Sequence, residues 1–195
     1  MSVLDANKVV LKLFLENESS ADLEQYIPVF HRVIREKLVP GILIDVADYR
    51  HVHQGPGVML IGHETDFAMD EAEGHVGLRF NRKRGDSGGL EQSLRSGLTE
   101  LLSLARLLEQ APELDGAQAF STSDLYFGVN DRLLAPNSPE TFESCESVIR
   151  DIAVDLSGAD TFELKHVEDP RAIFGARLGL SSSPSLDTLI GRLAD

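Results

Sequence analysis

The sequence predicts an α+β fold made of two tandem ferredoxin-like units, each running strand, helix, strand, strand, helix with antiparallel sheets. Segments with the apolar pattern of strands are interspersed with longer stretches whose apolar residues recur every three or four positions, as in amphipathic helices. The order of these segments nearly repeats between residues 1–115 and 116–195, which we interpret as two units of one domain. We expect the units either to share one sheet or to form a barrel-like pseudo-dimer.

The first unit opens with an apolar strand at 9–16 that contains β-branched and aromatic residues and no breaker. The apolar spacing from Leu23 to Leu38 predicts a helix, which either begins near Tyr26 with Pro28 in its first turn or is kinked at Pro28. The unit is completed by strands at 42–48 and 57–63, an extra strand at about 75–82 and a strongly amphipathic helix from Leu90 to Leu108.

The second unit follows the same plan. Ser138-Pro139-Glu140 is a favourable helix start, with a serine cap, a proline in the first turn and an acid beside the positive end of the helix dipole. Its other segments are strands at 124–129, 161–167 and 172–178 and a short last helix that opens at Ser183-Pro184. Two stretches correspond between the halves, Val33-Ile34-Arg35 with Val148-Ile149-Arg150 and Asp48–Val52 with Glu163–Val167. The identities are few, so an internal duplication and a similarity of architecture alone both stay open.

The composition argues against several classes of function. Acidic residues number 32 against 18 lysines and arginines, which gives a net charge of −14. Such a surface repels phosphate backbones and anionic headgroups, so we expect no nucleic-acid and no membrane partner. The only cysteine, Cys145, cannot form an internal disulfide and falls on the apolar stripe of its helix. We therefore expect a buried, inert thiol in a reducing, cytoplasmic setting.

Residues 85–89, Gly-Asp-Ser-Gly-Gly, match the sequence around the nucleophilic serine of trypsin-like proteases. We reject that function because the match lies in mid-chain at the start of a helix, and no histidine stands in the context that those enzymes use. A second interpretation is a loop that binds a small anion at the helix start. Its residues are Arg82, Lys83, Arg84, Ser87, Gly88 and Gly89. The alternative is a capped helix start preceded by a solvated basic turn.

The hairpin at 48–66 is the other candidate site, because it contains three of the six histidines. If the hairpin pivots near residues 55–56, His63 lies opposite Asp48, and the two form an acid–base pair beside Glu64. His51 and His53 then face the other side, unless a bulge brings His51, His53 and His63 together around a divalent metal. The alternative is that all three histidines are exposed or bonded only to neighbours.

Three functions remain as expectations. The first is a cytoplasmic protein that binds a small anionic ligand or a partner without catalysis. The second is a metal-assisted or acid–base enzyme, such as a hydrolase or lyase, that uses Asp48, His63 and Glu64. The third is a subunit of a structural homo-oligomer, since the exposed sheet edges of such folds often pair between chains. We interpret the acidic stretch from Glu64 to Glu73 as a solvated loop, because it lacks the ligand spacing of a calcium loop.

Overall fold

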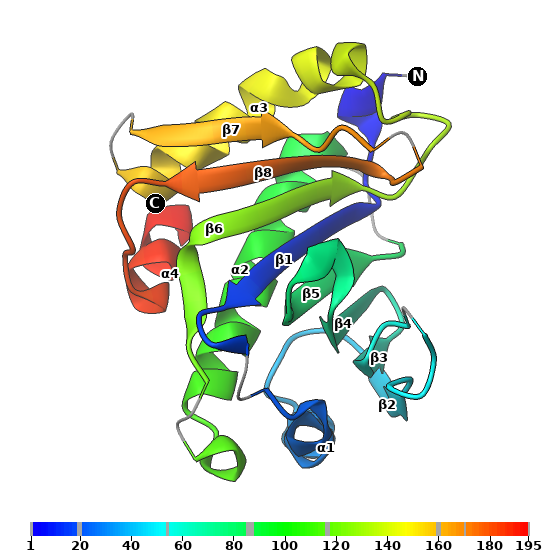
Figure 1. The fold of residues 1–195 in the computed structure, drawn as a ribbon, viewed down its shortest axis with the longest axis vertical. Coiled ribbons are helices and arrows are strands. Elements are labelled where there is room, and N and C mark those ends of the chain that lie inside the picture. Colours follow the sequence, from blue (N-terminus) through cyan, green and yellow to red (C-terminus); the bar gives the residue numbers. More distant parts are fainter. Residues whose placement is uncertain are drawn as a thin grey trace.

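The structure is a computed structural model that describes residues 2–18, 21–53, 55–84, 88–115, 118–158, 161–169 and 171–194. These residues form one open, antiparallel, eight-stranded sheet and four α-helices (Figure 1). The strands are β1 (Val9–Leu15), β2 (Leu43–Asp48), β3 (Val58–Gly62), β4 (Thr65–Asp70), β5 (Gly77–Arg82), β6 (Phe120–Val129), β7 (Phe162–His166) and β8 (Phe174–Leu180). The helices are α1 (Tyr26–Glu36), α2 (Gly89–Glu109), α3 (Pro139–Ser157) and α4 (Leu186–Ala194).

The strand order is β2-β3-β4-β5-β1-β6-β8-β7, so β1 lies inside the sheet and pairs with β5 and β6. The α+β class and the antiparallel pairing of the strands agree with the prediction. The barrel-like alternative is wrong, because the strand order ends at β2 on one side and at β7 on the other. Helix α1 begins at Tyr26 with Pro28 in its first turn, and Ser138 caps α3 by accepting a hydrogen bond from the Thr141 N–H.

Strand β4 is the element that the sequence analysis missed. Residues 65–70 were expected in a solvated acidic loop, but they pair with β3 on one side and β5 on the other. Asp66 and Asp70 are buried, and the ammonium groups of Lys83 and Lys12 neutralise them at 2.8 and 2.6 Å. The first half therefore runs strand, helix, four strands, helix, which departs from the predicted unit.

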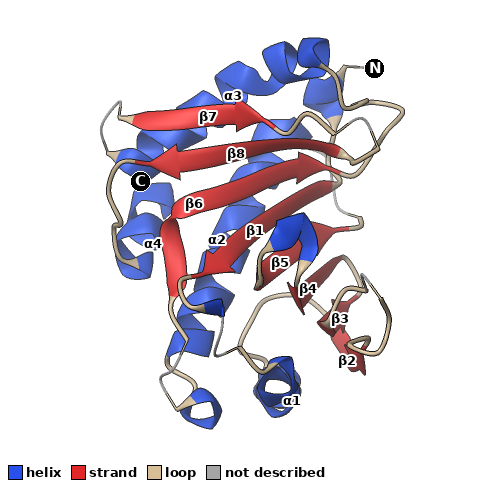
Figure 2. Ribbon diagram, in the orientation of Figure 1, coloured by secondary structure: helices blue, strands red, loops and turns tan. Residues whose placement is uncertain are grey.

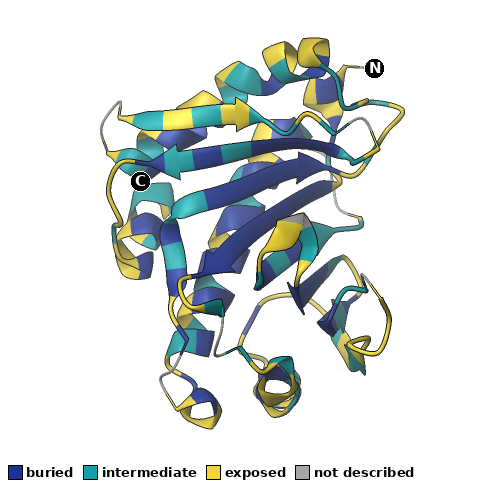
Figure 3. Ribbon diagram, in the orientation of Figure 1, coloured by how far each residue is buried: buried dark blue, intermediate teal, exposed yellow. Residues whose placement is uncertain are grey.

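The four helices cover one face of the sheet (Figure 2). Alternate strand residues, such as Leu11 and Leu13 of β1, join helix residues such as Leu98 of α2 in one hydrophobic core. The centre of the sheet is the most buried part, and the outer surfaces of β7 and the helices are the most exposed (Figure 3). Of the helices that the structure describes, none combines the length and the apolar character needed to cross a bilayer.

The opposite face of the sheet, which we call the open face, carries no α-helix in the described residues (Figure 2). One cross-strand row on this face contains, each opposite the next, Ala68, Arg79, Lys12, Tyr126, Arg177 and Lys165. Tyr126 is nonetheless buried, because its ring lies against Gly128 and Gly175, where a Cβ atom would stand within 3.0 Å of the tyrosine. The register of the sheet thus gathers charged side chains on a face that no helix covers.

Candidate functional site

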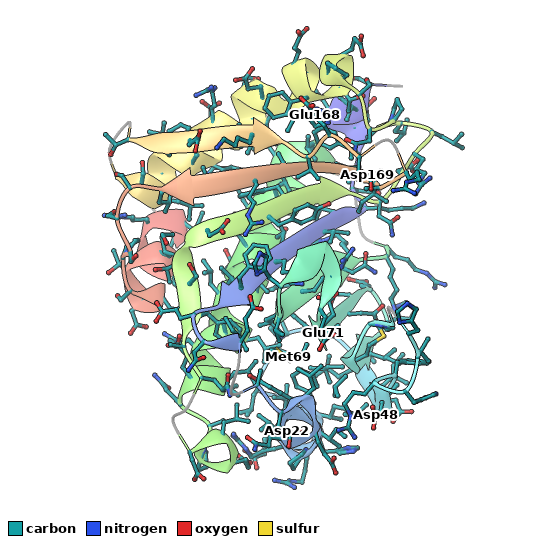
Figure 4. The ribbon with its side chains drawn as sticks, in the orientation of Figure 1. Asp22, Asp48, Met69, Glu71, Glu168 and Asp169 are labelled. Atoms are coloured by element: carbon teal, nitrogen blue, oxygen red, sulfur yellow. The ribbon has the colours of Figure 1, made fainter. Side chains whose placement is uncertain are left out.

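A cavity with a volume of about 730 Å³ lies beside the end of β2. Three segments line it: residues 21–23 before α1, the β2–β3 loop (residues 49–53 and 55–57) and the turn at 71–74 after β4. We call it the main cavity. Asp22, Asp48 and Glu71 come from or adjoin these segments and lie in the same lower part of the molecule (Figure 4). The cavity therefore lies at the hairpin that the sequence analysis singled out.

The β2–β3 loop is held against β4 by its backbone. The Tyr49 N–H donates to the Gly57 carbonyl at 2.7 Å, and two tight turns follow, from Tyr49 to Val52 and from Val52 to Gly55. Gly57 has a φ of +65°, and a Cβ atom there would stand 2.0 Å from the Met69 carbonyl oxygen. Only glycine fits this position, because the backbone of the loop closely approaches the neighbouring strand.

A buried lysine on β1 fixes the turn at 71–74. The Lys12 ammonium donates to Asp70 at 2.6 Å, to the Ala72 carbonyl at 2.5 Å and to the His75 carbonyl at 2.8 Å. These hydrogen bonds tie the turn after β4 to β1. Lys12 is fully buried, and the turn that it holds forms one wall of the main cavity.

The charge around the main cavity is negative. Its one arginine, Arg50, donates to both oxygens of Asp48, at 2.9 and 2.7 Å, and to Glu24 at 3.0 Å. The hydrogen bonds from the Arg50 side chain, and then from its backbone N–H, lower the pKa of Asp48 to about 2. Asp22 and Glu71 also line the cavity, and no side-chain partner is present for Glu71 among the described residues. Two carboxylates therefore bind the guanidinium, and two others line the cavity.

The structure separates Asp48 from His63. Asp48 lies opposite Val58, and the His63 N–H donates to the Ile42 carbonyl at the other end of the β2–β3 pair. The expected pairing of Asp48 with His63 is therefore wrong, and Asp48 binds Arg50 instead. The cause is the length of the β2–β3 loop, which centres the hairpin near residue 53 instead of at 55–56.

The three histidines do not converge on a metal site. His51, His53 and His63 are all exposed, and His53 alone lines the main cavity. Within the described residues, no three histidine, cysteine, aspartate or glutamate side chains are grouped so that they could hold a metal ion. The backbone carbonyl of Glu64 accepts hydrogen bonds from the N–H groups of Lys83 and Arg84.

The predicted anion loop is occupied by the chain's own groups. Arg82 donates to Ser96 and Glu100, and Lys83 donates to Asp66 and to the Gly62 carbonyl. These contacts engage two of the three cations with partners inside the protein. Arg84 is exposed, and its side chain has no partner among the described residues.

The glycines of that loop also have internal roles. A Cβ atom on Gly88 would overlap the Gln92 side chain, and one on Gly89, whose φ is +80°, would stand 2.8 Å from the Leu4 carbonyl oxygen. Glycine is therefore needed at position 89, whereas the neighbour of Gly88 is an exposed side chain that can move. Ser87 lies outside the residues that the structure describes, so its predicted role is not addressed.

Sequence reasoning missed Tyr49, Arg50, Asp22 and Glu71 as cavity residues. Tyr49 and Arg50 stand beside Asp48 in the sequence, but neither belongs to a motif that would distinguish it from a surface residue. Comparison of the sequence with models of known protein families and with curated proteins finds no match. The geometry and charge of the cavity are therefore the basis for inferring a function.

Proposed function

We propose that this protein binds a small organic cation, a primary amine with an apolar or aromatic body, in the main cavity and performs no covalent chemistry on it. The observation that carries the proposal is the charge of the cavity. Glu71 and Asp22 line it, and the only arginine beside them is already bound by two other carboxylates. A cation placed there gains attraction from carboxylates, whereas an anion meets net negative charge.

The apolar part of the lining supports an organic cation over a bare metal ion. Tyr49 and Val52 line the cavity and are 39% and 44% exposed, and Leu23 lines it from the segment before α1. The tyrosine ring can attract an ammonium through its π face while the aliphatic groups cover the body of the ligand. The volume of about 730 Å³ lies within the usual range for small-molecule sites.

The ionisation and the placement of the residues concerned support binding without a covalent step. An effective general base has a pKa near the working pH, whereas Arg50 holds the pKa of Asp48 at about 2. His63 lies at the far end of the hairpin from Asp48, so it cannot act on a molecule bound beside that carboxylate. These facts favour binding over the hydrolase or lyase alternative.

Isothermal titration calorimetry with three molecules of one shape tests the proposal. Tryptamine, tryptophol and indole-3-acetate carry the same indole ring with a positive, neutral and negative side chain. We expect tryptamine to bind about tenfold more tightly than tryptophol, which corresponds to about 1.4 kcal/mol, and indole-3-acetate to bind least. Equal affinities for the three, or a preference for indole-3-acetate, would refute an amine site.

Two glutamate variants locate the site. Glu71→Gln removes a carboxylate from the cavity, whereas Glu168→Gln makes the same change at the opposite end of the molecule (Figure 4). We expect Glu71→Gln to weaken tryptamine binding about tenfold and Glu168→Gln to leave it unchanged. Equal losses in both variants would mean that tryptamine responds only to the net charge of −14.

Anion binding near the start of α2 is the runner-up. Arg84 is the exposed cation that favours it, since the side chains of Arg82 and Lys83 already bind carboxylates. Inorganic phosphate should then raise the melting temperature, and Arg84→Ala should abolish the rise. An identical rise in the wild type and in Arg84→Ala would remove this alternative.

Self-association through β2 is a second function that one observation favours. Leu38, Ile42 and Ile44 are 39%, 70% and 59% exposed, and the latter two lie at or beside the edge strand β2. Exposed apolar side chains on an edge strand promote pairing with another chain. Sedimentation should then detect dimers that Ile44→Lys dissociates, and a monomer at all concentrations would exclude a homo-oligomer.

The order of the strands in the sheet supports the proposed tandem ferredoxin-like duplication. In both halves the first strand lies inside the sheet and the second at an edge, as β1 with β2 and β6 with β7. On this view β3 and β4 are a hairpin inserted into the first unit. Separate expression of residues 116–195 tests the idea, because a unit with its own core should yield a cooperative unfolding transition.

A further inference from the structure

Of the histidines that the structure describes, His53 alone lines the main cavity. Two turns of the β2–β3 loop fix its backbone there. The Val52 N–H donates to the Tyr49 carbonyl, and the Gly55 N–H donates to the Val52 carbonyl, both at 2.9 Å. An imidazole is thus held at the wall of a cavity whose charge is otherwise negative.

His53 is the lining residue of the type that changes charge near neutral pH. The other charged or titratable groups of the cavity are Asp22 before α1, Tyr49 and Arg50 in the β2–β3 loop and Glu71 in the turn after β4, with Asp48 and Glu24 bound to Arg50. Carboxylates, phenols and guanidinium groups ordinarily keep one charge state between about pH 5.5 and pH 8, whereas an imidazole ordinarily does not.

Two further histidines lie near the main cavity without lining it. His51 is exposed in the same loop, two residues before His53. His75 directly follows the turn at 71–74, and its Nδ1 lies 2.7 Å from a carboxylate oxygen of Glu18. Histidines at these positions gain charge over the same range of pH. They are therefore matched controls for an effect that belongs to His53.

We propose that protonation of His53 weakens the binding of an amine in the main cavity. This inference rests on the proposed function, because it concerns the same site and the same ligand. An imidazolium adds one positive charge to the lining, which repels the ligand's ammonium and offsets one of the carboxylates. Two like charges about 8 Å apart in a solvent-exposed site at low salt change an affinity about threefold. The amine therefore binds more tightly at about pH 8 than at about pH 5.5.

Calorimetry with tryptamine at about pH 8 and about pH 5.5 tests the proposal, because an alkylammonium keeps its charge at both values. We expect the affinity of the wild type to fall at least about threefold on acidification, and the fall to persist in His51→Gln and His75→Gln. In His53→Gln the affinity should be nearly equal at the two pH values. Tryptophol, which carries no charge, should bind the wild type equally at both. An equal fall for tryptamine in His53→Gln and His51→Gln would assign the effect to the charge of the whole protein and overturn the proposal.

An NMR titration of the histidine rings gives a second measurement on the wild type. Coupling between two binding events is reciprocal, so saturation with tryptamine should make the His53 ring take up its proton at a lower pH. An unchanged titration of His53 would overturn the proposal.

The two levels of the argument fail in different ways. Absence of tryptamine binding at about pH 8 would refute the amine site and this inference with it. Tryptamine binding that is equally tight at both pH values would overturn the role of His53 alone and leave the amine site standing.

Discussion

Replacing Lys12 by methionine tests how the turn at 71–74, which lines the main cavity, is held in place. The lysine is fully buried, its ammonium contacts the Asp70 carboxylate at 2.6 Å, and Asp70 is itself 2% exposed. Methionine keeps most of the apolar volume but leaves Asp70 without its nearest cation and removes the donor from two backbone carbonyls. The remaining cation, Arg79, is 3.5 Å from the carboxylate.

Removing one partner of a buried ion pair costs about 3–5 kcal/mol of stability, because the other charge stays buried without compensation. We expect Lys12→Met to lie near the lower end, about 3 kcal/mol, since Arg79 still contacts Asp70. This is a large share of the roughly 5–15 kcal/mol by which a domain is stable. The loss should appear in urea unfolding as a lower midpoint at unchanged slope.

Two further variants make the test specific. Lys165→Met changes a lysine in the same cross-strand row that is 67% exposed and paired with an equally exposed Glu163, so it should cost less than about 1 kcal/mol. Combining Lys12→Met with Asp70→Leu removes both charges and should recover part of the loss. If Lys12→Met were no more damaging than Lys165→Met, the buried pair would not hold the turn and our reasoning would be wrong.

Three other outcomes follow from the structure. NMR titration should give Asp48 a pKa of about 2, against an ordinary 3.8, and Arg50→Ala should return the pKa towards 3.8. Because the pKa is lower in the folded protein, the pair's contribution to stability is complete above about pH 4 and is lost as the pH falls towards 2. Burial raises the pKa of the Cys145 thiol to about 11, so a thiol reagent at pH 8 should react with it only as fast as the protein unfolds, and rapid stoichiometric labelling would contradict this. Gly41→Ala should cost roughly 1–2 kcal/mol, because Gly41 has a positive φ but no atom within 4 Å of the added methyl group. Gly57→Ala should destabilise the protein by more than this, because its methyl group also meets the backbone of Met69. Equal losses of stability in thermal unfolding would exclude the backbone clash.

The sequence predicted most elements because their patterns are local. The continuous apolar run of β1 and the stripe of α2 depend on residues that are near one another in the chain. Strand β4 was not predicted, because the partners of its charged residues are distant in the sequence. Phe67 and Met69 alternate with Asp66, Ala68 and Asp70 as a strand requires. The lysines that neutralise the two aspartates, however, lie 17 and 58 residues away. No local pattern indicates such partners, so the carboxylates resembled a solvated loop.

The sequence predicted where the candidate site lies but not which residues form it. Residues between 49 and 57 of the predicted hairpin do line the main cavity. The hairpin register, however, depends on turns within the β2–β3 loop that take up more chain than a tight hairpin. That difference moves His63 away from Asp48 and leaves Arg50 as the carboxylate's partner. Glu71 reaches the cavity because Lys12 holds its turn, a tertiary effect that sequence spacing does not reveal.

The most direct test of the amine site is an NMR titration of isotope-labelled protein with tryptamine. Our account predicts saturable amide shifts concentrated in three separate segments, 21–23, 49–57 and 71–74, which meet only at the main cavity. The same titration on Glu71→Gln should show these shifts at about tenfold higher tryptamine concentration. Shifts confined to residues 84–92, or none in the three segments at millimolar tryptamine, would contradict the claim that the main cavity binds an organic cation.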